Sequence, residues 1–224
     1  MIDLHSHVLP GLDDGAQTLD DSIALARAAA DAGTSILAAT PHIRVDHPFD
    51  VARVRPAVQE LNTTLEAAGI ALEVVSGGEV AISSFFDLSD DELTSVCLGD
   101  GRSLLVESPY TPANDLGRLA RLVEQGVKCS ITAASMAGGF GQNVQRASVR
   151  MFEAGLVHDV ASDAHGALRR PPGLMAGFEQ LDAQRWVDSS GRRERRSCEY
   201  GRPSHAAHPI RRQATTDSAR AAGS

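Results

Sequence analysis

Short apolar runs alternate with amphipathic segments along most of the chain. Six runs have the length and aliphatic content of buried strands: MIDL at 1–4, SILAAT at 35–40, IALEVVSGGEV at 70–80, RSLLVES at 102–108, VKCSITAAS at 127–135 and LVHDVASDAH at 156–165. The segments between them predict helices over residues 18–33, 50–69, 114–126 and 143–155. Because strands alternate with helices, we predict an α/β fold with parallel strands, in a layer or a barrel.

Local signals mark where these helices begin and end. Thr18 with the acidic pair Asp20–Asp21 is typical of a helix start, and Gly33 is typical of a helix end. Gly126 closes the third helix in the same way. Since proline prefers the first turn of a helix, Pro56 predicts a late start for the second helix.

The last part of the chain differs from the rest in composition and charge. Residues 1–184 hold 12 basic and 25 acidic groups (net −13), whereas residues 185–224 hold 9 basic and 4 acidic groups (net +5). We therefore predict one domain over 1–184 and a disordered tail over 185–224, where no apolar period is visible. One alternative is a basic arm for nucleic acid. Another is a frame-shifted translation, because one Lys beside 20 Arg indicates a GC-rich gene.

Bulk composition excludes several classes of protein. A hydrophobic fraction of 42% suits a soluble globular domain. No apolar run reaches the ~18 residues that a membrane span needs, and no secretory signal is visible at the N-terminus. The three cysteines lie far apart, which favours a reducing cytoplasm over a disulfide framework. The acidic body disfavours nucleic acid as the main partner, since phosphate binding needs clustered basic side chains.

Histidines and carboxylates follow five of the six predicted strands. The C-terminal ends of parallel strands meet at one rim in an α/β barrel, so we expect these side chains to converge. Asp13 is the exception, because a turn or cap role explains it better than metal ligation. The side chains expected at the rim are His5, His7, Asp14, His42, Glu79, Glu107, Asp163 and His165.

Carboxylates that converge in this way repel one another unless cations lie between them. Mixed His and Asp/Glu ligands suit Mn, Fe or Zn. Two or three such ions activate water and stabilise an oxyanion, which favours hydrolysis of phosphate esters. A cysteine-nucleophile phosphatase is excluded, because the positions six residues after the three cysteines are Ser103, Ser135 and Ser204, and none is arginine.

Six motifs, in this order over about residues 1–180, resemble a known family: MIDLHSHVLPGLDDGA, ATPH, GGEV, LLVESPY, ITAASMAGGFG and LVHDVASDAHGALRRPPGL. They are similar to the bacterial capsule-operon tyrosine phosphatases, the CpsB/YwqE group of the PHP (polymerase and histidinol phosphatase) superfamily. The resemblance implies a distorted (β/α)7-type PHP barrel and two or three divalent ions, with Mn²⁺ expected and Fe or Zn as alternatives. It also implies a phosphotyrosine protein as substrate, namely a bacterial tyrosine kinase that controls polysaccharide synthesis and export.

The resemblance also assigns roles to individual residues. His5 and His7 hold the first metal with Glu79 and Asp163, and Glu79 bridges to a second metal that Glu107 also binds. The third metal takes Asp14, His42 and His165. Arg170 matches the arginine that holds the phosphate, with Arg169 as the adjacent alternative. The catalytic set implied is therefore Asp163, His165 and Arg170.

One family motif is absent. The family places a His-Pro-Glu-Arg motif on a strand between the strand of Glu107 and ITAAS, and its histidine is a ligand of the second metal. No histidine lies between His47 and His158 here, so the barrel is expected to lack one βα unit. Two alternatives therefore stand beside the tyrosine phosphatase. One is a small-molecule phosphatase of the histidinol phosphate type, and the other is a non-catalytic remnant that binds metal or the kinase.

Overall fold

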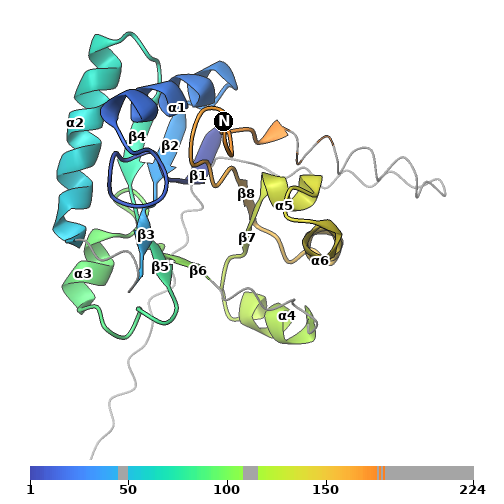
Figure 1. The fold of residues 1–224 in the computed structure, drawn as a ribbon. Coiled ribbons are helices and arrows are strands. Elements are labelled where there is room, and N and C mark those ends of the chain that lie inside the picture. Colours follow the sequence, from blue (N-terminus) through green and yellow to red (C-terminus); the bar gives the residue numbers. More distant parts are fainter. Residues whose placement is uncertain (45–49, 108–115, 176, 178, 180–224) are drawn as a thin grey trace, which may run out of the picture.

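The computed structural model describes residues 1–44, 50–107, 116–175, 177 and 179 of the chain, and Figure 1 shows their arrangement. The predicted tail over 185–224 lies outside the described residues. Its separation from a domain over 1–184 therefore stays a prediction. Among the described helices, none has both the length and the apolar character that a bilayer span requires.

Every strand pair in the described chain is parallel, as predicted. The strands form three small sheets with the orders β1-β2-β4, β3-β5-β6 and β7-β8. Their bounds are β1 Ile2–Ser6, β2 Ile36–Ala39, β3 His42–Ile43, β4 Glu73–Ser76, β5 Glu79–Ala81, β6 Leu105–Glu107, β7 Ser130–Thr132 and β8 Asp159–Ala161.

Two short breaks separate strands that follow each other along the chain, and only the second break lies within a predicted strand segment, because the segment 35–40 ends before β3. Thr40 and Pro41 separate β2 from β3, and Gly77 and Gly78 separate β4 from β5. Proline has no N–H to donate to a sheet, and a Cβ at Gly78 would lie 2.5 Å from Ile43 Cδ1. The two breaks lie side by side in neighbouring strands. After the two breaks, β3 pairs with β5, and His42 lies opposite Glu79, so two candidate ligands are next to each other.

Strand β8 lies beside β1, which brings the last strand of the domain next to the first. The Asp163 N–H donates to the His5 carbonyl at 2.9 Å, and the His7 N–H donates to the Ala164 carbonyl at 2.8 Å. The strands therefore run in the order β7, β8, β1, β2/β3, β4/β5, β6. Among the described residues β6 and β7 do not pair with each other, so no closed barrel forms. The missing βα unit was predicted between these two strands.

The helices agree with the predicted segments except in two places. They are α1 Leu19–Asp31, η1 Val51–Arg53, α2 Val54–Ala67, α3 Asp90–Ser95, α4 Leu116–Glu124, α5 Ala133–Ala137 and α6 Gln142–Glu153. Thr18 caps α1 in a capping box with Asp21, and Gly33 follows its end with φ 87°. The sequence reasoning missed α3. It also extended the fifth strand too far, because Thr132 caps α5 by accepting the Ser135 N–H at 3.1 Å.

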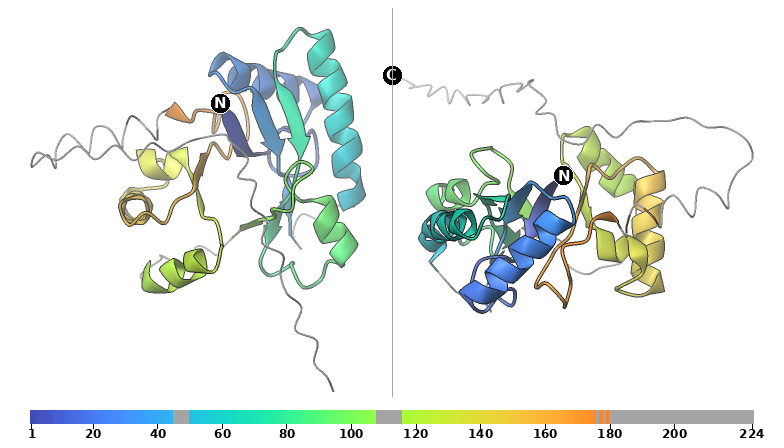
Figure 2. Two further views of the ribbon diagram at one scale, coloured as in Figure 1. Left: turned by 180° about the vertical axis from the view of Figure 1, so that it is seen from behind. Right: turned by 90° about the horizontal axis from the view of Figure 1, so that it is seen from above.

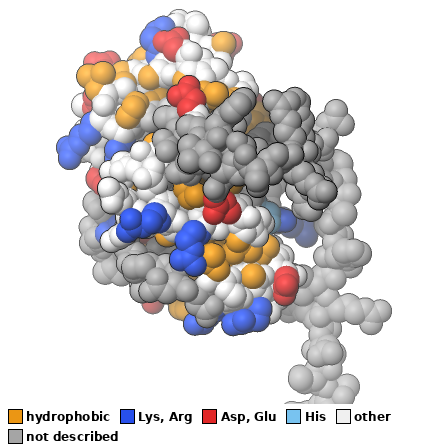
Figure 3. All heavy atoms as spheres, turned by 90° about the vertical axis from the view of Figure 1, so that its right-hand side faces the viewer, with side chains coloured by type: hydrophobic (Ala, Val, Ile, Leu, Met, Phe, Trp, Pro, Cys, Tyr) orange, Lys and Arg blue, Asp and Glu red, His pale blue; other side chains and the backbone are white. Residues whose placement is uncertain are grey.

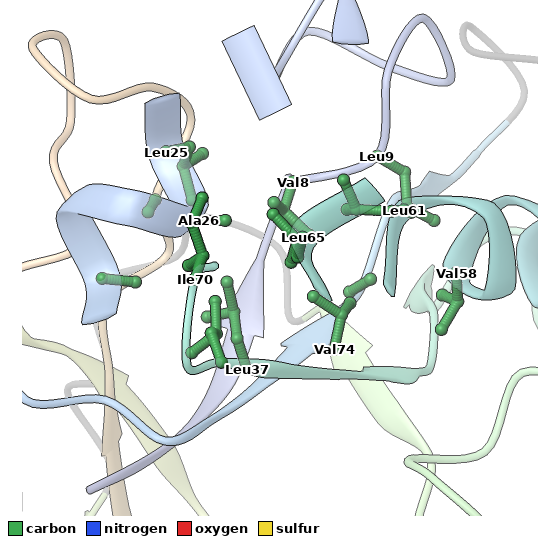
Figure 4. Packing of buried hydrophobic residues seen from close by; sticks show 14 of the residues in the cluster. Val8, Leu9, Leu25, Ala26, Leu37, Val58, Leu61, Leu65, Ile70 and Val74 are labelled. Atoms are coloured by element: carbon green, nitrogen blue, oxygen red, sulfur yellow. The ribbon is translucent and has the colours of Figure 1, made fainter. Parts of the chain in front are cut away.

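The main hydrophobic core lies between α1, α2 and the β1-β2-β4 sheet, on one side of the molecule (Figure 2). Leu25 of α1, Leu65 of α2 and Leu37 of β2 are fully buried there, and Figure 4 shows how these side chains interdigitate. This core contains 16 buried residues, including Ala164 from the loop after β8. It therefore supports the strands that end at the candidate site.

Packing is much thinner around α4 and α6. The core between β7, β8, α5 and α6 contains four buried residues, and no residue of α4 is buried. Leu122 is 41% exposed and Val127 is 46% exposed. Figure 3 shows the face on which α4, α5 and α6 lie, where hydrophobic side chains are visible among Lys and Arg side chains.

Candidate metal centre

Four side chains converge, from β1 and the residue directly after it, from β5, and from the loop after β8. His5 Nε2 and His7 Nε2 are 3.2 Å apart. Glu79 Oε2 lies 3.4 and 3.6 Å from these two nitrogens, and Asp163 Oδ1 lies 3.5 and 3.3 Å from them. Two ligands of one tetrahedral ion are about 3.4 Å apart when each bond is ~2.1 Å. The distances from the two imidazole nitrogens to each carboxylate therefore match those between ligands of one divalent cation, and His5, His7 and Asp163 form one candidate metal group.

All eight predicted ligands belong to clusters whose ligand atoms lie within 4.8 Å of one another. The clusters are His5, His7 and Asp163; His42, Glu79 and Glu107; and His7, Asp14, His42 and His165. His42 belongs to two of them, because its imidazole lies 2.7 Å from Glu79 Oε2 through Nδ1 and 3.5 Å from Asp14 Oδ1 through Nε2. The donor set contains nitrogen and oxygen and no thiolate, which suits Mn, Fe or Zn.

Asp13 has the turn role that the sequence favoured, and it also holds two of these histidines in place. Its Oδ2 accepts the His7 Nδ1–H at 2.6 Å and the His42 backbone N–H at 2.9 Å. Its Oδ1 accepts the Gly15 N–H at 2.9 Å. The bond to Nδ1 leaves His7 Nε2 as the metal-facing nitrogen, the usual arrangement of a carboxylate behind a ligating histidine. The carboxylate lies six residues after His7, which is the only sequence signal for this role.

Asp13 and His7 also change each other's pKa. Burial lowers the pKa of His7, but hydrogen bonds to Asp13 and Asp163 outweigh burial and raise it to about 9. Burial raises the pKa of Asp13, yet the hydrogen bond from His7 lowers it to about 2. The two groups therefore form an ion pair within the metal-free protein.

Glu79 and His165 are shifted toward the forms that bind metal. Burial raises the pKa of Glu79, but hydrogen bonds from His42 and His5 lower it well below its usual range. Burial lowers the pKa of His165 to about 4, and the charges of His7 and Arg170 add to this effect. At neutral pH the carboxylate is therefore ionised and the imidazole of His165 is neutral, as metal ligation requires.

The loop between His7 and α1 is shaped by one glycine. A Cβ on Gly15 would lie 2.2 Å from the His7 carbonyl oxygen, so only glycine fits. The Ala16 N–H donates to that same carbonyl at 3.0 Å. This close return of the chain carries Asp13 behind His7, and it leaves the half-exposed side chain of Asp14 at the mouth of the cluster.

Arg170 lies at the cluster, whereas Arg169 is exposed. The guanidinium of Arg170 contacts Asp163 Oδ2, and its Nη1 lies 2.9 Å from His165 Nε2. The backbone of Arg170 has φ 57°, and its carbonyl accepts the His165 N–H at 3.1 Å. The Cζ atom also lies 5.6 Å from the centroid of the Phe140 ring. Phe140 lies in the turn between α5 and α6.

The sequence model of a family described as "Capsular polysaccharide synthesis, CpsB/CapC" matches residues 1–119 and 110–189. These two segments cover well over half of the chain. The chain belongs to the CpsB/CapC family. Its two matched segments overlap at 110–119, between β6 and β7, where the sequence analysis expects one βα unit to be absent.

Two related sequences and one related crystal structure are similar to this chain over most of its length. The chain is 36% identical over 203 residues to the tyrosine-protein phosphatase YwqE of Bacillus subtilis, covering 76% of this chain and 79% of YwqE. It is 27% identical over 204 residues to CapC of Staphylococcus aureus, with the same coverage. It also matches a chain from the crystal structures of YwqE and of CpsB from Streptococcus pneumoniae, described as unique metal-dependent tyrosine phosphatases. That match has a TM-score of 0.72 and 31% identity, and it covers 82% of this chain and 87% of that chain.

The second cluster is the one to which, as the resemblance implies, the histidine of the absent His-Pro-Glu-Arg motif would belong. Among the described residues it consists of His42, Glu79 and Glu107. Arg44 lies near it, with Nη1 3.9 Å from Glu107 Oε2. His158 cannot complete the cluster, because it lies before β8 and its Nδ1 accepts the Cys129 N–H at 3.2 Å. His47, His205 and His208 lie outside the described residues.

Proposed function

We propose that this chain is a metal-dependent phosphoester hydrolase that removes phosphate from phosphotyrosine in proteins. The observation that carries the proposal is that His5 Nε2 and His7 Nε2 lie 3.2 Å apart and each lies within 3.6 Å of carboxylate oxygens of both Glu79 and Asp163. The activity ascribed to YwqE, with its 36% identity, supports the choice of phosphotyrosine. The capsule family favours a bacterial tyrosine kinase as the protein substrate.

The proposal assigns the ligands to two or three ions, with Mn²⁺ expected and Fe or Zn as alternatives. His5, His7, Glu79 and Asp163 would hold the first ion. Glu79 and Glu107 would hold the second, and Asp14, His42 and His165 would hold the third. When bound, such ions supply an activated water for in-line attack and neutralise charge on the phosphoryl group.

Arg170, Asp163 and His165 are the proposed catalytic residues. The planar guanidinium of Arg170 suits a phosphoryl group whose charge spreads over several oxygens in the transition state. Asp163 and His165 hold this guanidinium at the edge of the cluster, so it is oriented before the substrate arrives. Tyrosinate, with a pKa near 10, leaves more easily than an alkoxide, so strong general-acid help is not required.

We further propose that the fold is a distorted PHP barrel that lacks one βα unit. Support comes from β6 and β7, the two outer strands, which flank the position of the missing unit. The free thiols Cys97 and Cys129 suit the cytoplasmic location expected from the sequence.

The decisive experiment combines metal analysis with a phosphatase assay on the purified chain. We expect bound divalent metal, release of phosphate from p-nitrophenyl phosphate and from a phosphotyrosine peptide, loss of turnover with EDTA, and recovery with Mn²⁺. Histidinol phosphate serves as the comparison substrate. Glu79→Gln should lose both metal and turnover, whereas Asp50→Asn, a remote carboxylate that caps η1, should lose neither. Turnover that survives chelation would refute the mechanism.

The missing His-Pro-Glu-Arg segment favours one alternative, a non-catalytic remnant that still binds metal or the kinase. This alternative predicts bound metal without phosphate release from any of the substrates. Insertion of the family's absent βα unit between β6 and α4 distinguishes the two functions. The insertion should create activity in a remnant, and it should only increase activity in an enzyme.

A further inference from the structure

Asp3 is a fully buried carboxylate for which neither the metal clusters nor the sequence motifs provide a role. It lies on β1, two residues before His5, with none of its surface exposed. Its Oδ1 accepts the His5 N–H at 3.3 Å and the Ser162 N–H at 3.0 Å. Its Oδ2 has no hydrogen-bond partner among the described residues. A buried carboxylate is costly, so its presence here calls for a specific role.

The two N–H groups that Asp3 binds belong to the ends of β1 and β8, two of the strands that supply candidate ligands. His5 follows Asp3 on β1, and Ser162 comes directly before Asp163 at the end of β8. The pairing of β1 with β2 shifts register between Asp3 and Ser6, so the ladder is irregular at this level. The Asp3 carboxylate therefore bridges β1 to β8 at the level where the pairing of β1 with β2, on its other side, is irregular.

Just beyond this bridge the two strand ends deliver their ligand atoms. The Asp163 N–H donates to the His5 carbonyl at 2.9 Å, and Asp163 Oδ1 then lies 3.5 Å from His5 Nε2. Asp163 adopts φ 54° at this point, a conformation that depends on support from its neighbours. A small shift of β8 relative to β1 would separate these two ligand atoms directly.

We propose that Asp3 is a positioning residue of the metal centre, which sets the spacing of His5 and Asp163 by joining the backbones of β1 and β8. This inference rests on the proposed metal centre and adds a residue that touches neither metal nor substrate. Only the Oδ1 atom makes the two bonds. An amide in place of the carboxylate therefore preserves the bridge, whereas a methyl group removes it.

Asn62 offers a matched control, because it also bridges to a strand by side-chain hydrogen bonds. Its amide donates to the Val74 carbonyl at 2.8 Å and accepts the Val74 N–H at 2.9 Å, which ties α2 to β4 away from the ligands. Loss of this bridge should lower the stability of the metal-free protein without changing the ligand geometry. Asp3 and Asn62 therefore separate a positioning role from a general structural role.

The experiment measures Mn²⁺ affinity by competition with a chelating indicator and unfolding of the metal-free proteins, for D3A, D3N and N62A beside the wild type. We expect D3A to bind Mn²⁺ about 10- to 100-fold more weakly, the loss typical of a residue that supports a ligand. D3N should bind nearly as the wild type does. N62A should unfold more easily and keep its affinity.

Equal affinity of D3A and wild type would overturn the inference and leave the proposed function intact. Equal losses in D3A and N62A would reduce Asp3 to a structural residue, with the same consequence. A wild-type chain that binds no Mn²⁺, Fe or Zn would overturn both proposals. If D3A does not fold, Asp3→Ser replaces it, because the shorter serine side chain cannot reach both N–H groups. The Mn²⁺ affinity must then fall in Asp3→Ser and stay near that of the wild type in D3N.

Discussion

Replacement of Asp13 by asparagine tests how far the centre depends on a side chain that binds no metal in the proposed assignment. The Asp13 carboxylate accepts three hydrogen bonds, from His7 Nδ1, from the His42 N–H and from the Gly15 N–H. Asparagine has one oxygen, so its amide group must face at least one of these donors. A buried donor left without an acceptor costs about 1–3 kcal/mol, which is the expected loss of stability in the metal-free protein.

The larger effect should appear in metal binding. Without the carboxylate, the His7 ring loses the partner that keeps the proton on Nδ1 and the lone pair on Nε2. Loss of such a partner weakens metal binding about 10- to 100-fold, which corresponds to about 1.4–2.8 kcal/mol. The affinity is measured by competition with a chelating indicator, and unfolding in denaturant gives the stability. Asp50→Asn provides the control, because that carboxylate accepts the Ala52 N–H at an exposed helix start.

The reasoning would be refuted by an Asp13→Asn protein that binds Mn²⁺ as tightly as the wild type. It would also be refuted by equal losses in Asp13→Asn and Asp50→Asn, since the effect would then reflect charge alone. A folded variant with weaker binding and a retained ligand set is the expected result. The loss of affinity should be largest for the first ion, the one that the proposed assignment gives to His7.

Three further predictions concern pH, packing and substrate contact. The pKa of His7 is about 9 in the metal-free fold, so its stabilising effect is complete below its ordinary pKa of 6.5 and is lost as pH rises through 9. The pKa of Asp13 is about 2, so its stabilising effect is present above its ordinary pKa of 3.8 and is lost as pH falls toward 2. Unfolding in denaturant should therefore show the greatest stability between these limits, and the pH profile of Asp13→Asn should be flatter. Leu65→Ala should cost about 2–5 kcal/mol and Leu122→Ala less than about 1 kcal/mol, because Leu65 is fully buried and Leu122 is 41% exposed, and equal losses would contradict the packing described. Phe140→Leu removes the ring whose centroid lies 5.6 Å from Cζ of Arg170, and it should raise the KM for a phosphotyrosine peptide about 2- to 5-fold, from a cation–π energy of about 0.5–1 kcal/mol. An unchanged KM would show that this contact does not help to position Arg170.

The sequence predicted the long elements well, because their periodicity extends over many residues. Thr18 and Gly33 marked both ends of α1, and all six predicted strand segments contain a strand. Short elements were harder to predict, since α3 and α5 have only six and five residues. The strand segment predicted over 127–135 extended past Thr132 into alanines that favour a helix, and the cap geometry of Thr132 marks where α5 begins.

The candidate site could be predicted as a set of residue types but not as an arrangement. Ligand types at five strand ends implied a common rim, and the structure brings all eight side chains together. The supporting side chains were not visible in the same way. Asp13 resembles a turn residue, and Asp3 is hidden in the short run MIDL. Their roles depend on donors from His42 and Ser162, which are distant in sequence, so no local pattern reveals them.

The uneven distribution of buried side chains has a consequence for how this chain could lose part of its fold. Five of the eight candidate ligands come from residues 5–79, the region that also provides nearly all of the 16-residue core. The half that contains α4, α5 and α6 has a core of only four buried residues. A lineage could therefore discard a βα unit from the weaker half while the stronger half continued to fold and to present most of the ligands. In this fold, loss of a βα unit and loss of the metal ligands are therefore separate events.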